Sequence, residues 1–265
     1  MLDANSARFA YAVSGAGHPF TLLHAGIADS RMWDDQVPTF AQHYRVIRYD
    51  ARGFGRTEFP AVPYSTSEDV CAIIDALGVE KTYLLGCSMG GGVALDFALS
   101  QPDRVDALIL VGAGISGRKP SPELTAAFQR VEDAFERGGV AQAVELESRM
   151  WVDGPKRSPD QVNPDVRRRV DEMNTLAYSH AAQMAQAQHQ PLDPPAIGRL
   201  SEVHAPTLVV VGDGDQSDVI EAAELLAQGI PGARLTVMAG LGHVPNMEQP
   251  NDFNRLVLDF LSQLG

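Results

Sequence analysis

Residues 82–92 read Thr-Tyr-Leu-Leu-Gly-Cys-Ser-Met-Gly-Gly-Gly, an apolar run that ends at one serine followed by small residues. The apolar run predicts a buried strand and the residues after Ser88 predict a helix, so the serine lies on the turn between them. This is the Gly-x-Ser-x-Gly pattern of a nucleophile elbow. Gly86 and Gly90 lack Cβ atoms where strand and helix come closest, so we expect neither to tolerate a larger residue. Glycine-rich turns that have no catalytic function share this pattern, so the rest of the sequence is needed to distinguish a nucleophile elbow from such a turn.

Composition and charge limit the classes of protein to consider. The chain has 265 residues with 45% hydrophobic content, which favours one large core over two independent domains. Lys and Arg total 21 against 34 Asp and Glu, for a formal net charge of −13. No basic run is long enough to bind phosphates, so neither nucleic acid nor an anionic membrane is an expected partner. The densest basic cluster, 167–169, is interleaved with acidic residues and predicts a solvated helix face.

Cysteine usage and the N-terminal residues indicate the compartment. The two cysteines, Cys71 and Cys87, lie in a helical pattern and in the elbow, which favours reduced thiols over a disulfide framework. The first residues contain no charged segment followed by an apolar stretch, and eighteen apolar residues never run together. We therefore expect a soluble cytoplasmic protein.

The order of expected elements gives the fold class. Strand patterns cover 8–13, 20–24, 45–49, 82–86, 105–111, 206–211 and 234–238, and helical patterns lie between them, among them 32–43, 67–77, 218–230 and 251–264. From about 118 to 200 the chain has only helical patterns, over 121–137, 140–151 and 165–188. Alternating strands and helices on both sides predict an α/β core of residues 1–117 and 201–265 with a helical cap at 118–200.

Reactive side chains follow three of these strands. Ser88, Asp213 or Asp215, and His243 come in that chain order, and the carboxyl ends of parallel strands meet at one edge of a sheet. An imidazole takes a serine proton near neutral pH, and a carboxylate orients the imidazole. His243 is therefore the expected general base, because it alone among seven histidines follows glycines after a strand; in isolation it would be an ordinary loop histidine.

The acid is harder to choose, because Asp213, Asp215 and Asp218 lie in one short loop. Asp213 follows the first glycine and is suited to bond the backbone of the turn. Asp218 is placed to cap the next helix. We therefore prefer Asp215 as the partner of His243.

Two loops after strands offer backbone amides. The amides of Gly26, in the loop after the second strand, and Met89, directly after the serine, are the candidate oxyanion donors. Gly26 is also compatible with a plain turn. The loop at 50–57 has two glycines without the Lys-Ser/Thr of a phosphate loop, so we interpret it as structural, with contact between Arg52 or Phe54 and substrate as the alternative.

Taken together, these motifs resemble the α/β-hydrolase superfamily, and within it the capped serine esterase, enol-lactonase and C–C hydrolase group. The resemblance spans almost the whole chain: His-Ala-Gly at 24–26 with Met-Trp at 32–33, Asp-x-Arg-Gly-x-Gly at 50–55, the elbow, Gly-x-x-Asp at 212–215 and Gly-His at 242–243. It implies a mostly parallel eight-stranded sheet flanked by helices. It also implies Asp215 as the acid and the amides of Gly26 and Met89 as the oxyanion hole. Ala25 departs from the glycine usual in this family.

The expected function is hydrolysis of a small carboxylic ester through an acyl-enzyme, without metal or organic cofactor. Dehalogenases and epoxide hydrolases of this superfamily use a carboxylate nucleophile, and position 88 is serine. Lactonase and C–C hydrolase activity remain as alternatives, as does a non-hydrolytic receptor, since the resemblance includes receptors that keep the triad. The expected partner is a small ester or lactone. A homodimer is compatible with the sequence, which identifies neither the substrate nor the cap residues that line the pocket.

Overall fold

A computed structural model describes residues 1–264 of the chain. Its main sheet has seven strands in the order β3-β5-β4-β6-β7-β8-β9, of which only β3 runs antiparallel to its neighbour. These strands are β3 (Tyr11–Ser14), β4 (Pro19–Leu23), β5 (Arg45–Tyr49), β6 (Thr82–Cys87), β7 (Val105–Val111), β8 (Thr207–Gly212) and β9 (Arg234–Met238). The mostly parallel sheet expected from the sequence is confirmed.

The expected number of eight strands in the sheet is corrected to seven. β1 (Leu2–Ala4) and β2 (Ala7–Phe9) form a separate antiparallel hairpin. The break comes at Ala10, whose amide donates to Thr57 Oγ1 at 3.0 Å instead of to a neighbouring strand. The chain therefore leaves the hairpin and enters the main sheet only at Tyr11, and the single strand expected over 8–13 is divided in two.

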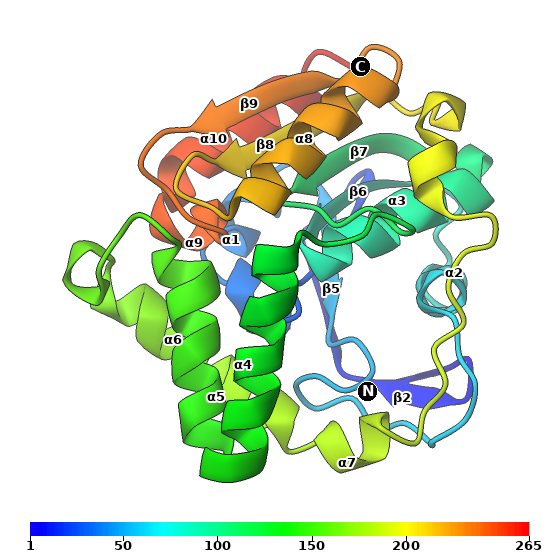
Figure 1. Cartoon of the computed structure of the whole chain (residues 1–265). Helices are drawn as coiled ribbons and strands as arrows, with labels where there is room; N and C mark the ends of the chain where they lie inside the picture. Colours follow the sequence, from blue (N-terminus) through cyan, green and yellow to red (C-terminus); the bar gives the residue numbers. More distant parts are fainter. Residues whose placement is uncertain (265) are drawn as a thin grey trace.

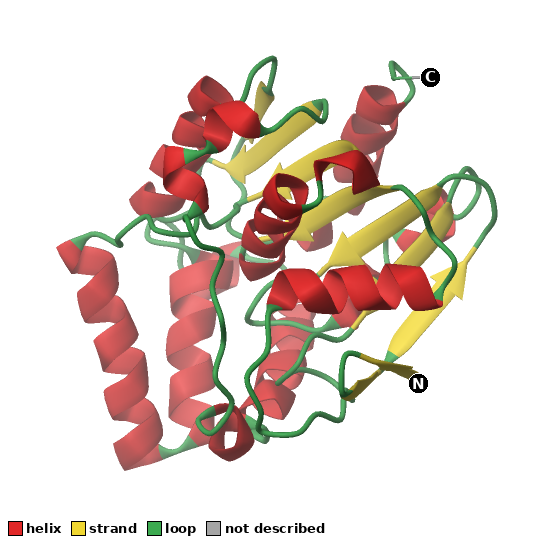
Figure 2. Cartoon of the chain, turned by 90° about the vertical axis from the view of Figure 1, so that its right-hand side faces the viewer, coloured by secondary structure: helices red, strands yellow, loops and turns green. Residues whose placement is uncertain are grey.

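Helices cover both faces of the main sheet (Figures 1 and 2). One core layer holds side chains of α2 (Thr66–Ala76), α3 (Met89–Ser100) and α8 (Ser217–Gly229). The other holds side chains of α1 (Val37–Phe40), α9 (Pro245–Glu248) and α10 (Pro250–Leu261). Alternate residues of β7 enter opposite layers, Leu108 and Leu110 one and Ile109 and Val111 the other, as a strand buried on both faces requires.

Some helices expected from the sequence are shorter or divided. The pattern over 32–43 becomes η1 (Ser30–Trp33) and α1, because Pro38 in the first turn of α1 cannot donate to the preceding turn. No helix of residues 1–264 combines the length and apolarity needed to cross a membrane.

Between β7 and β8 the chain forms helices. They are α4 (Pro122–Gly138), α5 (Val140–Glu147), η3 (Ser148–Asp153), η4 (Pro159–Gln161), α6 (Pro164–Tyr178), α7 (Ala181–Met184), η5 (Ala196–Gly198) and η6 (Leu200–Glu202). The three longest of them, α4, α5 and α6, lie together on one side of the sheet in Figure 1. The helix expected over 140–151 turns into a π-helix at Ser148, and that expected over 165–188 breaks after Tyr178. We keep the term cap segment for residues 118–200.

The basic cluster at 167–169 is not uniformly solvated, contrary to expectation. Arg167 is 15% exposed and pairs through Nε with the buried Asp153 at 2.8 Å. Arg169 pairs with Asp35 at 2.6 Å, whereas Arg168 is 59% exposed. Local charge interleaving could not reveal these partners, because they come from other elements.

Candidate active site

The elbow places Ser88 on a strained turn between β6 and α3. Its backbone has φ 53° and ψ −114°, in the left-handed half of conformational space that a residue with a side chain rarely adopts. The turn is fixed by hydrogen bonds, because the Ser88 amide donates to Val111 O at 2.8 Å and the Ser88 carbonyl accepts from the Gly114 amide at 3.2 Å. The serine is thus presented at the carboxyl edge of the sheet.

Close backbone approach explains the glycines of the elbow. A Cβ at Gly86 would lie 2.1 Å from Gly90 O, and one at Gly90 would lie 2.4 Å from Leu23 O and 2.6 Å from His24 O. All three distances are shorter than any nonbonded carbon–oxygen contact, and the opposing atoms are backbone. The geometry therefore requires glycine at both positions, as the sequence predicts.

His243 and Asp215 form a buried pair at the ends of β9 and β8. His243 Nδ1 lies 2.7 Å from Asp215 Oδ2, and the two side chains are only 2% and 1% exposed. A carboxylate accepts a hydrogen bond from an imidazole N–H, so this pairing favours the tautomer with the proton on Nδ1 and with Nε2 as the acceptor. A Cβ on Gly112 would lie 3.2 Å from His243 Nδ1, so the glycine at the end of β7 leaves room for the pair.

The other two carboxylates of this loop have structural roles. Asp213 Oδ1 accepts from the Gly240 amide at 2.6 Å and so ties two post-strand loops together. Asp218 does not cap the next helix as expected; it lies in the first turn of α8, behind the N-cap residue Gln216. Its carboxylate instead accepts from the amide and the hydroxyl of Ser121, each at 2.7 Å, near the start of the cap segment.

Ser88 and His243 line one cavity of about 230 Å³. Its other walls come from the loop after β7, from the cap segment and from α8, and include Ile115, Leu124, Phe128, Trp151 and Val219. Within residues 1–264, Ser88 Oγ is not hydrogen-bonded to the His243 ring, a looseness that catalytic contacts commonly show before substrate binds. The cavity is small and mostly apolar.

The two candidate oxyanion donors are neighbours. A Cβ on Gly26 would lie 3.6 Å from Met89 Cβ, and among residues 1–264 neither amide is hydrogen-bonded to an acceptor. The Gly26 loop is anchored by His24, whose Nε2 accepts from the Ala51 amide at 3.0 Å and whose Nδ1 lies 2.8 Å from Ala25 O. Burial lowers the pKa of His24, so this histidine is neutral and structural.

A second cavity, of about 210 Å³, is lined by Met89 and Gly90 together with residues of the 50–57 loop. Arg52 lies in its wall but is held by Asp69, with Nε 2.7 Å from Oδ2 and Nη2 2.8 Å from Oδ1. The guanidinium also lies 5.3 Å from the centre of the Tyr64 ring. Arg52 is therefore part of a buried ion pair that braces the loop. Phe54 packs edge-on against His24, at 5.0 Å between ring centres.

Trp151 is a site residue that sequence reasoning missed. Its indole lies over the His243 ring, with 4.5 Å between ring centres and 32° between planes, and its carbonyl accepts from the His243 amide at 3.2 Å. An aromatic residue in a helical pattern carries no signal of a partner 92 positions away. Among residues 1–264 no group of three or more His, Cys, Asp or Glu is placed to hold a metal ion.

Known proteins resemble this chain over most of its length. The family described as the alpha/beta hydrolase fold matches residues 18–250. A 2-hydroxy-6-oxononadienedioate/2-hydroxy-6-oxononatrienedioate hydrolase of Pseudomonas putida is 32% identical over 84% of this chain and 79% of its own.

Two solved structures resemble the whole chain. The enol-lactonase of Burkholderia xenovorans matches with a TM-score of 0.80 at 25% identity, covering 98% of both chains. A thermophilic esterase of Thermogutta terrifontis matches with a TM-score of 0.79 at 29% identity, covering 97% of this chain and 93% of its own. These relatives share hydrolytic chemistry, which supports a hydrolase. The chain belongs to the α/β-hydrolase family.

Proposed function

We propose that the chain is a serine hydrolase that cleaves small carboxylic esters through an acyl-enzyme. The observation that carries the proposal is the buried Asp215–His243 pair, whose imidazole shares a cavity with Ser88 on its strained turn. A base, an orienting carboxylate and a hydroxyl that lines the same cavity are the requirements of nucleophilic acyl transfer.

The mechanism follows from the positions of the groups. Ser88 Oγ attacks the acyl carbon while His243 Nε2 takes its proton, and Asp215 stabilises the resulting imidazolium. The carbonyl electrons move to the oxygen, which the amides of Gly26 and Met89 stabilise. The intermediate collapses, and the alcohol leaves with the proton from His243. Water then gives a proton to His243 and attacks the acyl carbon, and the acid is released as Ser88 regains its hydrogen.

Lactones are the second candidate substrates, since a lactone is an ester whose leaving group stays attached. The whole-chain similarity to an enol-lactonase favours them. C–C bond hydrolysis is favoured by the 32% identical relative, whose named substrate is a dicarboxylate. Against it, the one arginine in the cavity wall, Arg118, already lies 3.6 Å from Asp218 and 3.0 Å from Glu221, which leaves little positive charge for a dianion.

The test combines labelling with a substrate panel. A fluorophosphonate should label Ser88 in the wild-type chain and not in Ser88→Ala, while both proteins show the same melting temperature. Aryl esters, alkyl esters, lactones and a vinylogous diketone are then compared by kcat/KM. Wild-type rates of ester hydrolysis in Ser88→Ala would refute the mechanism. Labelling with negligible turnover across the panel would favour a receptor.

A further inference from the structure

The indole of Trp151 limits where the imidazole of His243 can lie. Asp215 holds the ring from its Nδ1 edge, and Trp151 covers one of its faces at 4.5 Å between ring centres. Trp151 belongs to η3, a π-helix, and such distortions of a helix often occur at functional sites. The position of the base therefore depends on how η3 is held.

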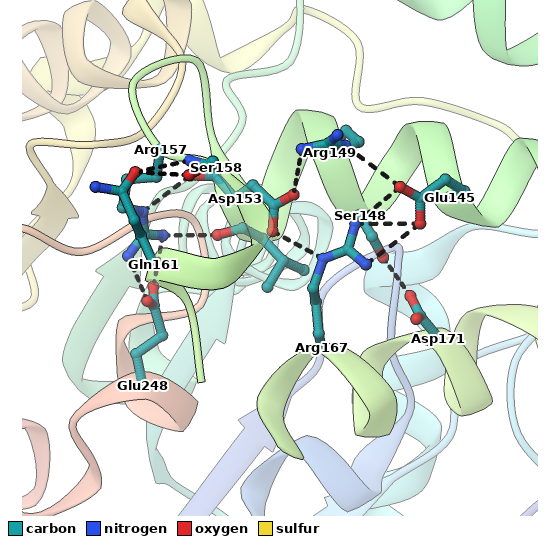
Figure 3. A network of polar contacts seen from close by, with 11 residues as sticks. Glu145, Ser148, Arg149, Asp153, Arg157, Ser158, Gln161, Arg167, Asp171 and Glu248 are labelled. Carbon is teal, nitrogen blue, oxygen red and sulfur yellow. Dashed lines mark hydrogen bonds and ion pairs between the residues drawn. The ribbon is translucent and has the colours of Figure 1, made fainter. Parts of the chain in front are cut away.

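Arg157 binds the carboxyl-terminal end of η3, the end away from α5. Its guanidinium donates from Nη2 to Val152 O at 2.6 Å and from Nε to Asp153 O at 2.9 Å. These are the last two carbonyls of the π-helix, directly after Trp151. Arg157 thus binds both backbone carbonyls at the end of the segment that carries the indole, and Figure 3 shows it between this segment and Glu248.

The same guanidinium reaches the loop that carries His243. Nη1 donates to Gly240 O at 3.0 Å and to Glu248 Oε2 at 2.5 Å, and Nη2 donates to Glu248 Oε1 at 3.2 Å. Glu248 Oε1 in turn accepts from the Gly242 amide at 2.7 Å. All five N–H donors of Arg157 are therefore used, and they join the two segments that meet at the imidazole.

Burial and close packing indicate that this contact is specific. The side chains of Arg157 and Glu248 are 12% and 6% exposed. A Cβ on Gly242 would lie 2.4 Å from Arg157 Nη2 and 2.8 Å from Val152 O. The His243 loop therefore packs so closely against these atoms that only glycine fits at this position. A bidentate arginine–carboxylate pair has the rigid geometry that such positioning needs.

We propose that Arg157 and Glu248 form a clamp that couples the cap segment to the His243 loop and sets the stacking of Trp151 on the imidazole. Both are positioning residues, since each acts through His243. The catalytic consequence rests on the proposed function, because it assumes that His243 is the base. Releasing the clamp leaves the hydrogen bond from the His243 amide to Trp151 O as a direct link between η3 and the loop, so the two segments can shift relative to each other. Displacements near 1 Å lower rates by about a hundredfold.

The test compares Arg157→Met with Arg167→Met. Arg167 is a matched control, since it is similarly buried at 15% exposure and pairs with Asp153 of η3, yet none of its hydrogen bonds reaches residues 240–243. Both variants should lose thermal stability. Only Arg157→Met should lower kcat and the rate of fluorophosphonate labelling, by about tenfold or more, with KM within about twofold.

A spectroscopic measurement reports the stacking without any turnover. The chain has two tryptophans, so in a Trp33→Phe background the emission comes from Trp151 alone. Arg157→Met should shift this emission to the red and increase its quenching by acrylamide, whereas Arg167→Met should not. If Arg157→Met does not fold, Arg157→Lys, Glu248→Gln and Arg167→Lys are compared in the same way, with the first two expected to show the smaller version of the same changes.

The two proposals fail differently. A chain without labelling or turnover would refute the proposed function, yet Trp151 emission would still test the clamp. Arg157 variants that fold, keep wild-type emission and keep the wild-type labelling rate would show a merely structural ion pair and overturn the clamp. Equal loss of labelling in the Arg157 and Arg167 variants would overturn it as well.

Discussion

Replacing Gly90 by alanine should separate the serine turn from the loop that supplies the Gly26 amide. The added methyl would lie 2.4 Å from Leu23 O at the end of β4 and 2.6 Å from His24 O. Ordinary contact needs about 3.4 Å or more, so α3 and the end of β4 must move apart by about 1 Å. Neither partner is a flexible side chain that could turn away.

Two opposing terms set the size of the effect on stability. Gly90 is the second residue of α3, so the gain from alanine is at most the value of about 1 kcal/mol for a helix interior, whereas overpacking a close contact costs about 1–3 kcal/mol. Because both clashing atoms are backbone, we expect an overpacking cost in the upper part of this range. The net loss of free energy of unfolding is then about 1–2 kcal/mol. For a chain of this size that loss lowers the melting temperature by about 2–8 °C. A 1 Å displacement of the donor loop lowers kcat by about a hundredfold.

The assay is kcat for the best ester of the panel, together with the labelling rate of Ser88 and a thermal melt. Gly198→Ala is the control, because a Cβ at Gly198 meets no atom within 4 Å. It should leave all three values close to wild type. A Gly90→Ala protein that melts and reacts like the Gly198→Ala protein would refute the steric reasoning.

Three further changes test other parts of the structure. Asp215→Asn should lower kcat by about 10⁴-fold without unfolding the chain, because the amide favours the wrong tautomer of His243; a loss below about tenfold would contradict this. Arg52→Met should cost about 3–5 kcal/mol in urea unfolding, since it leaves the buried Asp69 unpaired; a cost near zero would speak against the ion pair. Burial raises the pKa of Glu147 above its ordinary 4.5, so the folded chain retains this proton to higher pH than the unfolded chain. As the pH rises from 4.5 through the raised pKa, the wild type should therefore lose stability relative to the Glu147→Gln variant. A difference in melting temperature between the two proteins that does not change with pH would contradict the raised pKa.

The sequence predicted those parts of the molecule that local pattern determines. Apolar runs ending at reactive side chains located Ser88, Asp215 and His243 at strand ends, and the structure brings them to one edge of the sheet. Glycines were interpretable because a missing Cβ has a local steric meaning, as at Gly86. Even the choice between Asp213 and Asp215 followed turn chemistry, since Asp213 does bond a backbone amide.

What escaped prediction depends on contacts between distant residues. Trp151 contacts His243, and Arg157 contacts Glu248, although about 90 residues separate the partners in each pair. The periodicity of a sequence carries no information about contacts between residues so far apart. Asp218 was misassigned for the same reason, because its partner Ser121 precedes it by 97 positions. The eighth strand came from family resemblance, whereas β1 and β2 pair only with each other in a separate hairpin.

Strands β7 and β8, which flank the cap segment, are direct neighbours paired from Leu108 with Thr207 to Val111 with Val210. An insertion that leaves and re-enters a sheet at adjacent strands can be exchanged in evolution without changing the strand order. Recombination of whole insertions is thus an open route to new substrate ranges on this scaffold. If the proposed clamp holds, an incoming segment has to bring an arginine to Glu248 and an aromatic ring to His243, besides partners for residues such as Asp218 and Asp35.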